Sequence, residues 1–175
     1  MIAQREDSVS VLFCDIVNFS ELVQQHKNAA NLVAILNSVY STFDHLCTKN
    51  GVRKMETVGK TYMACAGLLG SRKDHAFAVV ELGEEMMALM AKCTDRKGDP
   101  LLIRIGINTG PVYSGIVGMK RPQFSLFGDT VNTASRMQST GIEGRIQVSQ
   151  ATYVMLCKDY RFYSRFVFPF PPCRG

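Results

Sequence analysis

The sequence predicts an α+β domain with a ferredoxin-like βαββαβ core and a mixed, mostly antiparallel sheet flanked by helices. Two long segments with helical spacing of apolar residues alternate with short, apolar, β-rich runs. Four of these runs form two pairs separated by glycine-containing turns, which is typical of antiparallel strands. The length of 175 residues suits one domain with a single core.

The predicted elements follow in an order that gives this fold. The first strand is expected at residues 8–14, a continuous apolar run that ends at Asp15. A helix begins near Ser20, and a longer one covers residues 31–48 before an Asn-Gly stop. A hairpin of residues 52–58 and 61–69 around Gly59-Lys60 comes next, and a Met-rich helix over 74–97 follows it. A strand pair is then expected at 101–108 and 112–118, around the turn Thr109-Gly110-Pro111. The last elements are a helix within 124–140, a strand over 145–149 and a helix over 150–157.

Composition excludes several classes of protein. Hydrophobic residues make up 46% and charged residues 20%, as in ordinary globular domains. The net charge of +5 is mild and the basic residues are scattered, so a nucleic-acid-binding tail is not predicted. The six cysteines form no CxxC pair, and we expect reduced thiols. No apolar run approaches the roughly 20 residues of a membrane span, and polar residues interrupt the N-terminal segment, so neither a span nor a signal peptide is expected.

The segment FSLFGDTVNTASRMQST, residues 124–140, carries a chemical signal. Asn132 and Arg136 are four residues apart in a predicted helix and therefore share one face. The preceding Gly-Asp-Thr is typical of a helix start with a capping-type side chain and free amides, and we include its Asp129 among the expected ligand contacts. This pattern suits an anion whose charge changes during a reaction. A solvated helix face that caps itself is the alternative.

Asp15 is the first candidate metal ligand. It ends a predicted buried strand just before a predicted helix start. A carboxylate in that place can bind a hard cation such as Mg²⁺, while the amides of the helix start bind phosphate oxygens. A local role in capping the turn explains the same pattern, so both interpretations stay open.

Four segments in this order resemble the catalytic domain of class III nucleotide cyclases, the adenylyl and guanylyl cyclases: FCDIVNFSEL, KMETVGKTYMACAGL, RIGINTGPVYSGIVG and FSLFGDTVNTASRM. The resemblance covers about residues 8–160. It implies a phosphorus–oxygen lyase that converts a nucleoside triphosphate to a 3′,5′-cyclic nucleotide and pyrophosphate for intracellular signalling. It also implies that two such domains form the site between them, with two divalent ions, Mg²⁺ or Mn²⁺.

The resemblance places the metal ligands on the carboxylate of Asp15 and the backbone carbonyl of Ile16, and the phosphate-binding turn at Phe19 and Ser20. The family's second metal-binding aspartate is replaced by Lys60, within Gly-Lys-Thr-Tyr-Met. An ammonium near two divalent ions repels them. We therefore expect this chain to hold the ions poorly and a partner domain to hold most of their ligands.

The resemblance also implies which groups contact the nucleotide. Asn132 and Arg136 match the residues that contact the ribose and stabilise charge on the α-phosphate. Arg104 matches a polyphosphate contact, with a solvent-facing strand residue as the alternative. Glu56 and Ser125 match the two base-selecting positions, with an exposed strand residue as the alternative for Glu56. A carboxylate can accept from guanine N1–H and the 2-amino group, which favours GTP over ATP, whereas the Ser125 hydroxyl suits either base.

Residues 1–165 are predicted to form the cyclase domain, and residues 166–175 a divergent proline-rich tail. Three prolines within four residues of that tail do not fit a central strand. The family's C-terminal hairpin, with its phosphate-binding lysine, should follow residues 160–162 and is expected to be missing.

The functional prediction is a cyclase domain that uses GTP, or else ATP, and is active only with a second cyclase domain. A heterodimer is favoured over a homodimer because a symmetric dimer repeats Lys60 in both sites. The alternative is a catalytically degenerate, cyclase-like module that regulates or dimerises. A nucleic-acid binder is disfavoured because the stacking aromatic motifs are absent. We expect a cytoplasmic domain, or one at the cytoplasmic face of a membrane within a larger protein.

Overall fold

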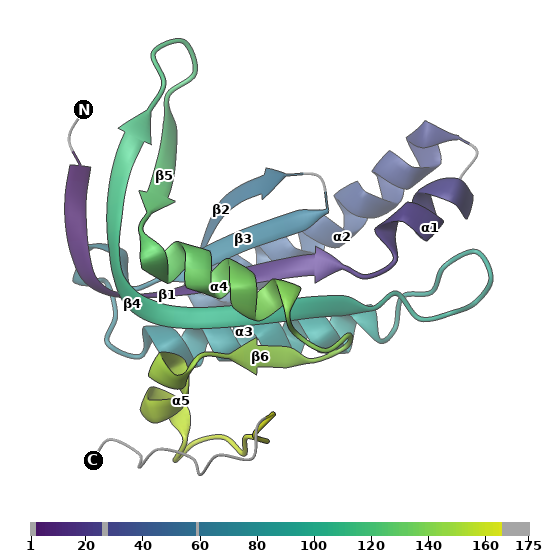
Figure 1. Cartoon of the computed structure of the whole chain (residues 1–175). Coiled ribbons are helices and arrows are strands. Elements are labelled where there is room, and N and C mark those ends of the chain that lie inside the picture. The colour runs from purple at the N-terminus through teal and green to yellow at the C-terminus, as the bar shows by residue number, and fades with distance from the viewer. Residues whose placement is uncertain (1–2, 26–27, 59, 166–175) are drawn as a thin grey trace.

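The computed structural model describes residues 3–25, 28–58 and 60–165, so the predicted tail 166–175 lies outside the described residues. A bent sheet carries α2 and α3 on one face and α4 on the other (Figure 1). In chain order the elements are β1 (Ala3–Ile16), α1 (Phe19–Gln25), α2 (Ala29–Asn50), β2 (Arg53–Val58), β3 (Thr61–Ala66), η1 (Leu68–Gly70), α3 (His75–Met90), β4 (Ile103–Val117), β5 (Gln123–Phe127), α4 (Asp129–Ser139), β6 (Ile146–Val148) and α5 (Gln150–Leu156).

The strand order confirms the predicted fold class. The sheet runs β2-β3-β1-β4-β5, and all of these neighbours pair antiparallel. β6 adds a parallel pairing with β4, so the sheet is mixed. Its first four strands, with the crossover helices α2 and α3, form the ferredoxin-like core.

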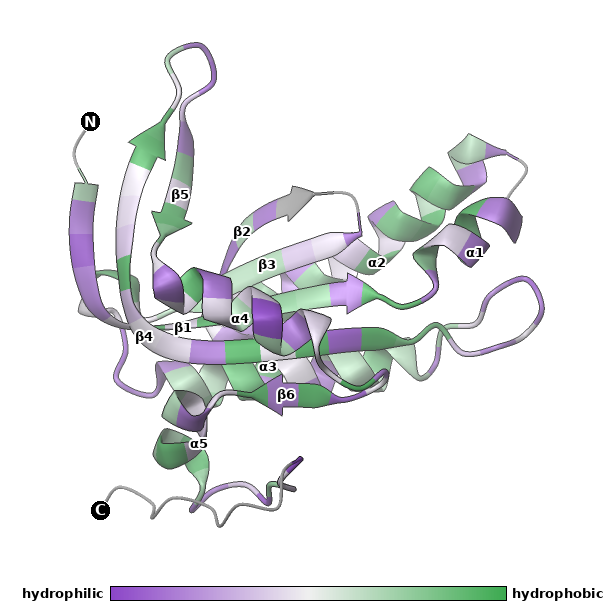
Figure 2. Ribbon diagram, viewed as in Figure 1, coloured by the Kyte–Doolittle hydropathy of each residue, from purple (hydrophilic) through white to green (hydrophobic). Residues whose placement is uncertain are grey.

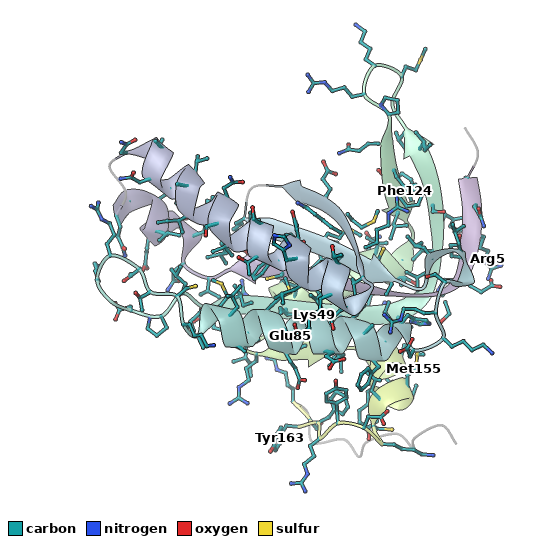
Figure 3. All side chains as sticks on the ribbon, turned by 180° about the vertical axis from the view of Figure 1, so that it is seen from behind. Arg5, Lys49, Glu85, Phe124, Met155 and Tyr163 are labelled. Carbon is teal, nitrogen blue, oxygen red and sulfur yellow. The ribbon has the colours of Figure 1, made fainter. Side chains whose placement is uncertain are left out.

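The main core lies between the sheet and the layer of α2 and α3. It contains buried aliphatic and aromatic residues such as Leu12, Phe43 and Ile105. On the outer side of that layer, the Lys49 ammonium lies 2.8 Å from the Glu85 carboxylate and joins the two helices (Figure 3). A smaller buried cluster lies on the opposite face and includes Ala134 of α4. The sheet therefore buries side chains on both faces.

β4 departs from the prediction. It is one continuous strand across Thr109-Gly110-Pro111, which the sequence reading placed in a turn. The reason lies in its partner, because the register of β1 shifts between Glu6 and Val9, opposite this segment. Pro111 therefore lies where the ladder is interrupted, and its missing N–H costs no strand hydrogen bond. The strand that pairs with the end of β4 is β5, which was not predicted as a strand.

The second long helix also ends earlier than predicted. α3 stops at Met90, whereas the helical pattern was extended to residue 97. The Asp95 carboxylate accepts from the amides of Lys97 and Asp99 at 2.8 and 2.9 Å. Such side-chain bonds to nearby amides compete with helical ones, and they close a turn here.

α4 packs unusually close to β4, at two glycines. Gly106 and Gly110 lie on one face of the strand, because alternate residues point the same way. A Cβ on Gly106 would lie 1.9 Å from the amide nitrogen of Gln138, and one on Gly110 would lie 2.7 Å from Oγ1 of Thr130. Both ends of α4 are thus held against the sheet at a distance that only glycine permits.

Two sequence expectations concern the chemistry of the chain as a whole. Cys14, Cys47, Cys65 and Cys93 are free thiols, as expected, whereas Cys157 is disulfide-bonded, contrary to the expectation. Among the described residues, no helix has the length and apolar character needed to cross a membrane.

Candidate active site

Asp15 lies at the end of β1 between two cations. Its neighbours across the sheet are Thr61 of β3 and Arg104 of β4. The side chain is only 8% exposed, and its Oδ2 lies 3.2 Å from Nζ of Lys60 and 3.9 Å from Nη2 of Arg104. Its Oδ1 is buried and has no hydrogen-bond partner among the described residues. The local site is therefore one carboxylate paired with an ammonium and a guanidinium.

This arrangement does not fit a two-ion site built by this chain. The unpartnered Oδ1 of Asp15 could accept one cation, but two hard divalent ions need several oxygen ligands. No group of three or more His, Cys, Asp or Glu side chains suited to a metal occurs in the part of the chain that the structure describes. Lys60 instead places its own positive charge against Asp15. Asp15 is thus paired with cations of this chain itself.

Cys14 does not add a ligand to this group. Burial, and then the neighbouring Asp15 carboxylate, raise the pKa of its thiol well above the ordinary value of 9.0. A thiol must lose its proton to bind a metal. Cys14 is therefore a protonated core residue.

The predicted phosphate-binding turn connects β1 to α1. Asn18 adopts a left-handed conformation with φ of 55°, and its carbonyl accepts from the amide of Leu22 at 3.1 Å. Phe19 is half-buried against the main core, whereas Ser20 is exposed. Ile16, the predicted carbonyl ligand, is buried and pairs with Ile103 of β4. The core thus anchors the turn and leaves Ser20 at the surface.

The predicted base-selecting residues lie where the two outer strands of the curled sheet approach each other. Oε1 of the exposed Glu56 on β2 accepts from Nε2 of Gln123 on β5 at 3.1 Å. The Arg53 guanidinium lies 4.3 Å from the ring centroid of Phe124, which Figure 3 labels on β5. Ser125, half-buried, follows on the same strand. Two contacts between β2 and β5 therefore bring Glu56 to the strand that carries Ser125.

Sequence reasoning missed Arg53 and Gln123 because it assigned no strand to β5. Their contacts join two strands that are far apart in sheet order, and they depend on the curl of the whole sheet. A polar Gln beside an aromatic residue just before the FGDT motif was the available signal. It was too weak to indicate a contact with β2.

Asn132 and Arg136 are both exposed on α4, one turn apart. The helix begins differently from the prediction, because Gly128 is its N-cap, with φ of 121° and no side-chain cap hydrogen bond. Asp129 is the first helical residue and is exposed, so the expected side-chain cap is wrong. A glycine at positive φ allows the turn without a capping side chain. The negative charge of Asp129 favours this end of the helix dipole.

The structure thus arranges the predicted residues in three groups. Asp15, Lys60 and Arg104 are in contact at the end of β1. Glu56 lies beside the strand of Ser125, between β2 and β5. The polar pair of α4 faces solvent on the other side of the helix from Ala134, which packs into the smaller core. The second and third groups leave their polar atoms accessible to a ligand.

Comparison with known proteins identifies the family of this chain. The family model "Adenylate and Guanylate cyclase catalytic domain" matches residues 1–168. The chain is 39% identical over 160 residues to an adenylate cyclase of Mycobacterium tuberculosis, covering 91% of this chain and 36% of that protein. It is 40% identical over 155 residues to guanylyl cyclase C of Homo sapiens, covering 86% of this chain and 14% of that protein. The chain therefore spans about a third or less of these relatives.

A solved structure shows the same fold. The guanylate cyclase domain of RhGC from Catenaria anguillulae, in complex with GTP, superposes with a TM-score of 0.82 and 36% identity, covering 87% of this chain and 84% of that one. Fold, motifs and matches together define a nucleotide cyclase catalytic domain. This chain belongs to the adenylate and guanylate cyclase family.

Proposed function

We propose that this chain forms the nucleotide-recognising half of a composite cyclase site and that a second cyclase domain forms the metal-binding half. The observation that carries the proposal is a contrast between two regions of the chain. Lys60 forms an ion pair with Asp15 on the metal side, while Asn132 and Arg136 are exposed and form no ion pair among the described residues. The nucleotide-recognising half thus retains Asn132 and Arg136, whereas the ion-binding half carries Lys60 where the family has its second aspartate.

The proposed reaction closes a ring on the α-phosphorus of a nucleoside triphosphate. The ribose 3′-oxygen forms the new bond to phosphorus, the bond to the pyrophosphate oxygen breaks, and the 3′-hydroxyl proton leaves to solvent or a base. Asn132 holds the ribose, and Arg136 stabilises the negative charge that develops on the α-phosphate. Preorganised donors of this kind are worth about 2.7–4 kcal/mol each. The divalent ions that the family uses would be bound by aspartates of the partner domain.

GTP is the proposed substrate, with ATP as the less favoured base. The Glu56 carboxylate accepts two hydrogen bonds from guanine N1–H and the 2-amino group, whereas adenine N1 is itself an acceptor. Glu56 already accepts from the Gln123 side-chain amide at 3.1 Å, which holds it at the β2–β5 contact. Gln123 thereby supports the position of the base-reading carboxylate.

A heterodimeric partner follows from the same contrast. A symmetric homodimer would present two equivalent sites, each with Lys60 beside Asp15. In a heterodimer with a cyclase domain that has both aspartates, one of the two sites contains no Lys60. Because the curated relatives are far longer than this chain, the partner domain belongs either to the same larger protein or to another subunit. A place at the cytoplasmic face of a membrane is part of this proposal.

The Lys60–Asp15 ion pair also favours a second candidate function. A degenerate cyclase-like module would bind a nucleotide, or a partner domain, and regulate it without turnover. The retained Asn132 and Arg136 argue against this candidate, because a pure scaffold has no physical need for both.

Turnover assays with GTP or ATP, and with Mg²⁺ or Mn²⁺, separate the two candidates. We expect no turnover by the chain alone, turnover by its mixture with a cyclase domain that has both aspartates, and a gain of turnover in Lys60→Asp alone. The charge-matched control is Lys92→Asp, at an exposed position just after α3. If no mixture and no variant turns over, the degenerate module is correct.

A further inference from the structure

The helices α3, α4 and α5 begin at the same end of the sheet (Figure 1). A chain of hydrogen-bonded polar side chains runs through the interior there. It starts at His75, the first residue of α3, whose Nδ1 lies 2.8 Å from Oγ of Ser10 on β1. Ser10 Oγ lies 2.7 Å from Oγ1 of Thr109 on β4, which lies 2.9 Å from Oγ1 of Thr152 on α5. His75, Ser10, Thr109 and Thr152 are all buried, which makes each bond costly to lose.

This chain of polar side chains continues to the opposite face of the sheet. Thr152 Oγ1 lies 3.4 Å from Oγ of Ser149, which donates to Oδ1 of Asn108 at 2.6 Å. The amide of the buried Asn108 donates to the backbone carbonyl of Thr130 at 3.0 Å. Thr130 lies in the first turn of α4, two residues before Asn132. The polar chain therefore ends on the helix that carries the proposed transition-state residues.

The hydrogen bonds of this chain have one consistent direction. Ser149 gives its single proton to Asn108, so the Thr152 hydroxyl is left to donate to Ser149. By the same count Thr109 donates to Thr152, and Ser10 donates to Thr109. Ser10 then has only its lone pairs for His75, so Nδ1 of His75 must carry the proton.

The other ring nitrogen of His75 completes this assignment. Nε2 lies 3.2 Å from Oγ of Ser8 and is left as an acceptor from that hydroxyl. The ring is therefore a neutral Nδ1–H tautomer, in keeping with its burial. Every proton in the chain points from α3 toward α4, and bonds aligned in this way polarise and strengthen one another.

We propose that this hydroxyl chain is a positioning device for α4, in which Thr109 and Asn108 fix the first turn of the helix and thereby set Asn132 and Arg136 for catalysis. The proposal rests on the proposed function for its catalytic part. Gly106 and Gly110 set how close α4 lies to β4. Because glycine has no side chain, these two residues do not fix the position of α4 along the strand. The Asn108–Thr130 bond supplies that directional contact.

Thr109 gives the sharpest test because valine has nearly its shape and lacks its hydroxyl. Thr109→Val removes the acceptor of the Ser10 hydroxyl and the donor to Thr152, whereas Thr109→Ser keeps the hydroxyl and serves as the rescue variant. In the active mixture we expect Thr109→Val to lower kcat about tenfold or more and to leave KM within about twofold, as for a misplaced catalytic group. Thr109→Ser should stay within about threefold of wild type.

A readout that needs no turnover makes the positioning claim independent of the proposed function. Hydrogen exchange of the amides in residues 128–134 should become faster in Thr109→Val and not in Thr109→Ser. The stability-matched control is Val39→Ala, a truncation of a buried residue on α2. It should lower Tm comparably and leave exchange in α4 unchanged. Equal exchange in α4 for Thr109→Val and wild type overturns the proposal, as does equal acceleration by Val39→Ala.

The tautomer of His75 tests the direction in which the hydrogen bonds of this polar chain are donated. A long-range ¹H–¹⁵N spectrum, with His75→Gln to identify the signals, should show a protonated Nδ1 and an unprotonated Nε2. A protonated Nε2 with a bare Nδ1 contradicts the directed chain. If exchange and tautomer behave as expected while no mixture turns over, the proposed function fails and the positioning of α4 stands.

Discussion

Lys60 illustrates how one residue changes the chemistry of a whole site. The backbone at the end of β1 places a buried carboxylate, Asp15, where a cation is needed to balance it. A bound ion could supply that charge, but the Lys60 ammonium at 3.2 Å and the Arg104 guanidinium at 3.9 Å supply it from within the chain. The carboxylate is thus neutralised without a metal, and an incoming divalent ion meets two like charges.

Glu56 should control which base is accepted. Glu56→Lys replaces an acceptor for guanine by a donor, and we expect the ratio of kcat/KM for GTP to that for ATP to fall about a hundredfold or more in the active mixture. The control is Glu143→Lys, the same charge change at an exposed position in the loop before β6. An unchanged ratio in Glu56→Lys would show that base choice lies elsewhere.

His75 should make stability depend on pH. Burial lowers its pKa below the ordinary value of 6.5; the Asp74 charge opposes this shift and the Arg72 charge adds to it, while β1 presents only hydroxyls. The unfolded chain then binds a proton near pH 6.5 that the folded chain resists, so the free energy of unfolding is lost as pH falls below about 6.5. Urea unfolding between pH 7 and 5 should show a shallower loss in His75→Gln than in wild type. Identical slopes would contradict a neutral His75.

The hairpin of β4 and β5 is the surface on which we expect the proposed partner domain to bind. The hairpin that they form extends away from the body of the sheet (Figure 1). Apolar residues lie along its end, and Figure 2 shows this character at the end of β4. Ile116 and Met119 are exposed there, at 59% and 99%, and Phe127, at the base of the hairpin opposite Tyr113, is exposed at 48%. Apolar side chains gathered on a projecting hairpin are typical of a protein–protein contact.

Ile116→Asp should therefore weaken assembly with the second cyclase domain. Because Ile116 is largely exposed in the single chain, we expect little change in Tm but at least about a tenfold increase in Kd, measured by sedimentation of the mixture. Val33→Asp is the matched control, since Val33 is 62% exposed on α2. Equal effects of the two variants, or no effect of Ile116→Asp, would place the partner on another surface.

The sequence predicted those elements whose signals are local. Apolar periodicity identified α2 and α3, and a Gly-Lys turn identified the β2–β3 hairpin. The predicted turn at Pro111 was wrong because a shift of register in β1, distant in sequence, lets proline lie within β4. β5 was missed for a related reason: it is a strand only because the bent end of β4 offers it a partner.

The same difference between local and long-range signals holds for the candidate site. The resemblance identified Asp15, Lys60, Glu56 and the polar pair of α4 by residue type and position. It could not give the 3.2 Å contact between Lys60 and Asp15, which depends on where a hairpin places a flexible side chain. Nor could it indicate the hydroxyl chain from His75 to α4, whose members come from four elements that meet only in the folded domain.

The proposed function makes the whole molecule an asymmetric half of an enzyme. One region of the chain presents the groups proposed to contact base, ribose and α-phosphate, and in another region Lys60 pairs with Asp15, the proposed metal ligand. The projecting hairpin offers a surface on which a metal-competent domain can complete the site. On the proposed function, activity is a property of the pair of domains, and the two halves of the site respond differently to mutation.

The most direct measurement compares kcat for alanine substitutions of two cationic residues, Arg136 and Lys60. Each variant is assayed in a mixture with a cyclase domain that has both aspartates. Arg136→Ala should lower kcat about a hundredfold or more, because it removes a donor to the charge that develops in the transition state. Lys60→Ala should leave kcat within about twofold, because the working ions are bound by the partner. Loss of turnover in Lys60→Ala, together with normal turnover in Arg136→Ala, would contradict the proposed division of the site.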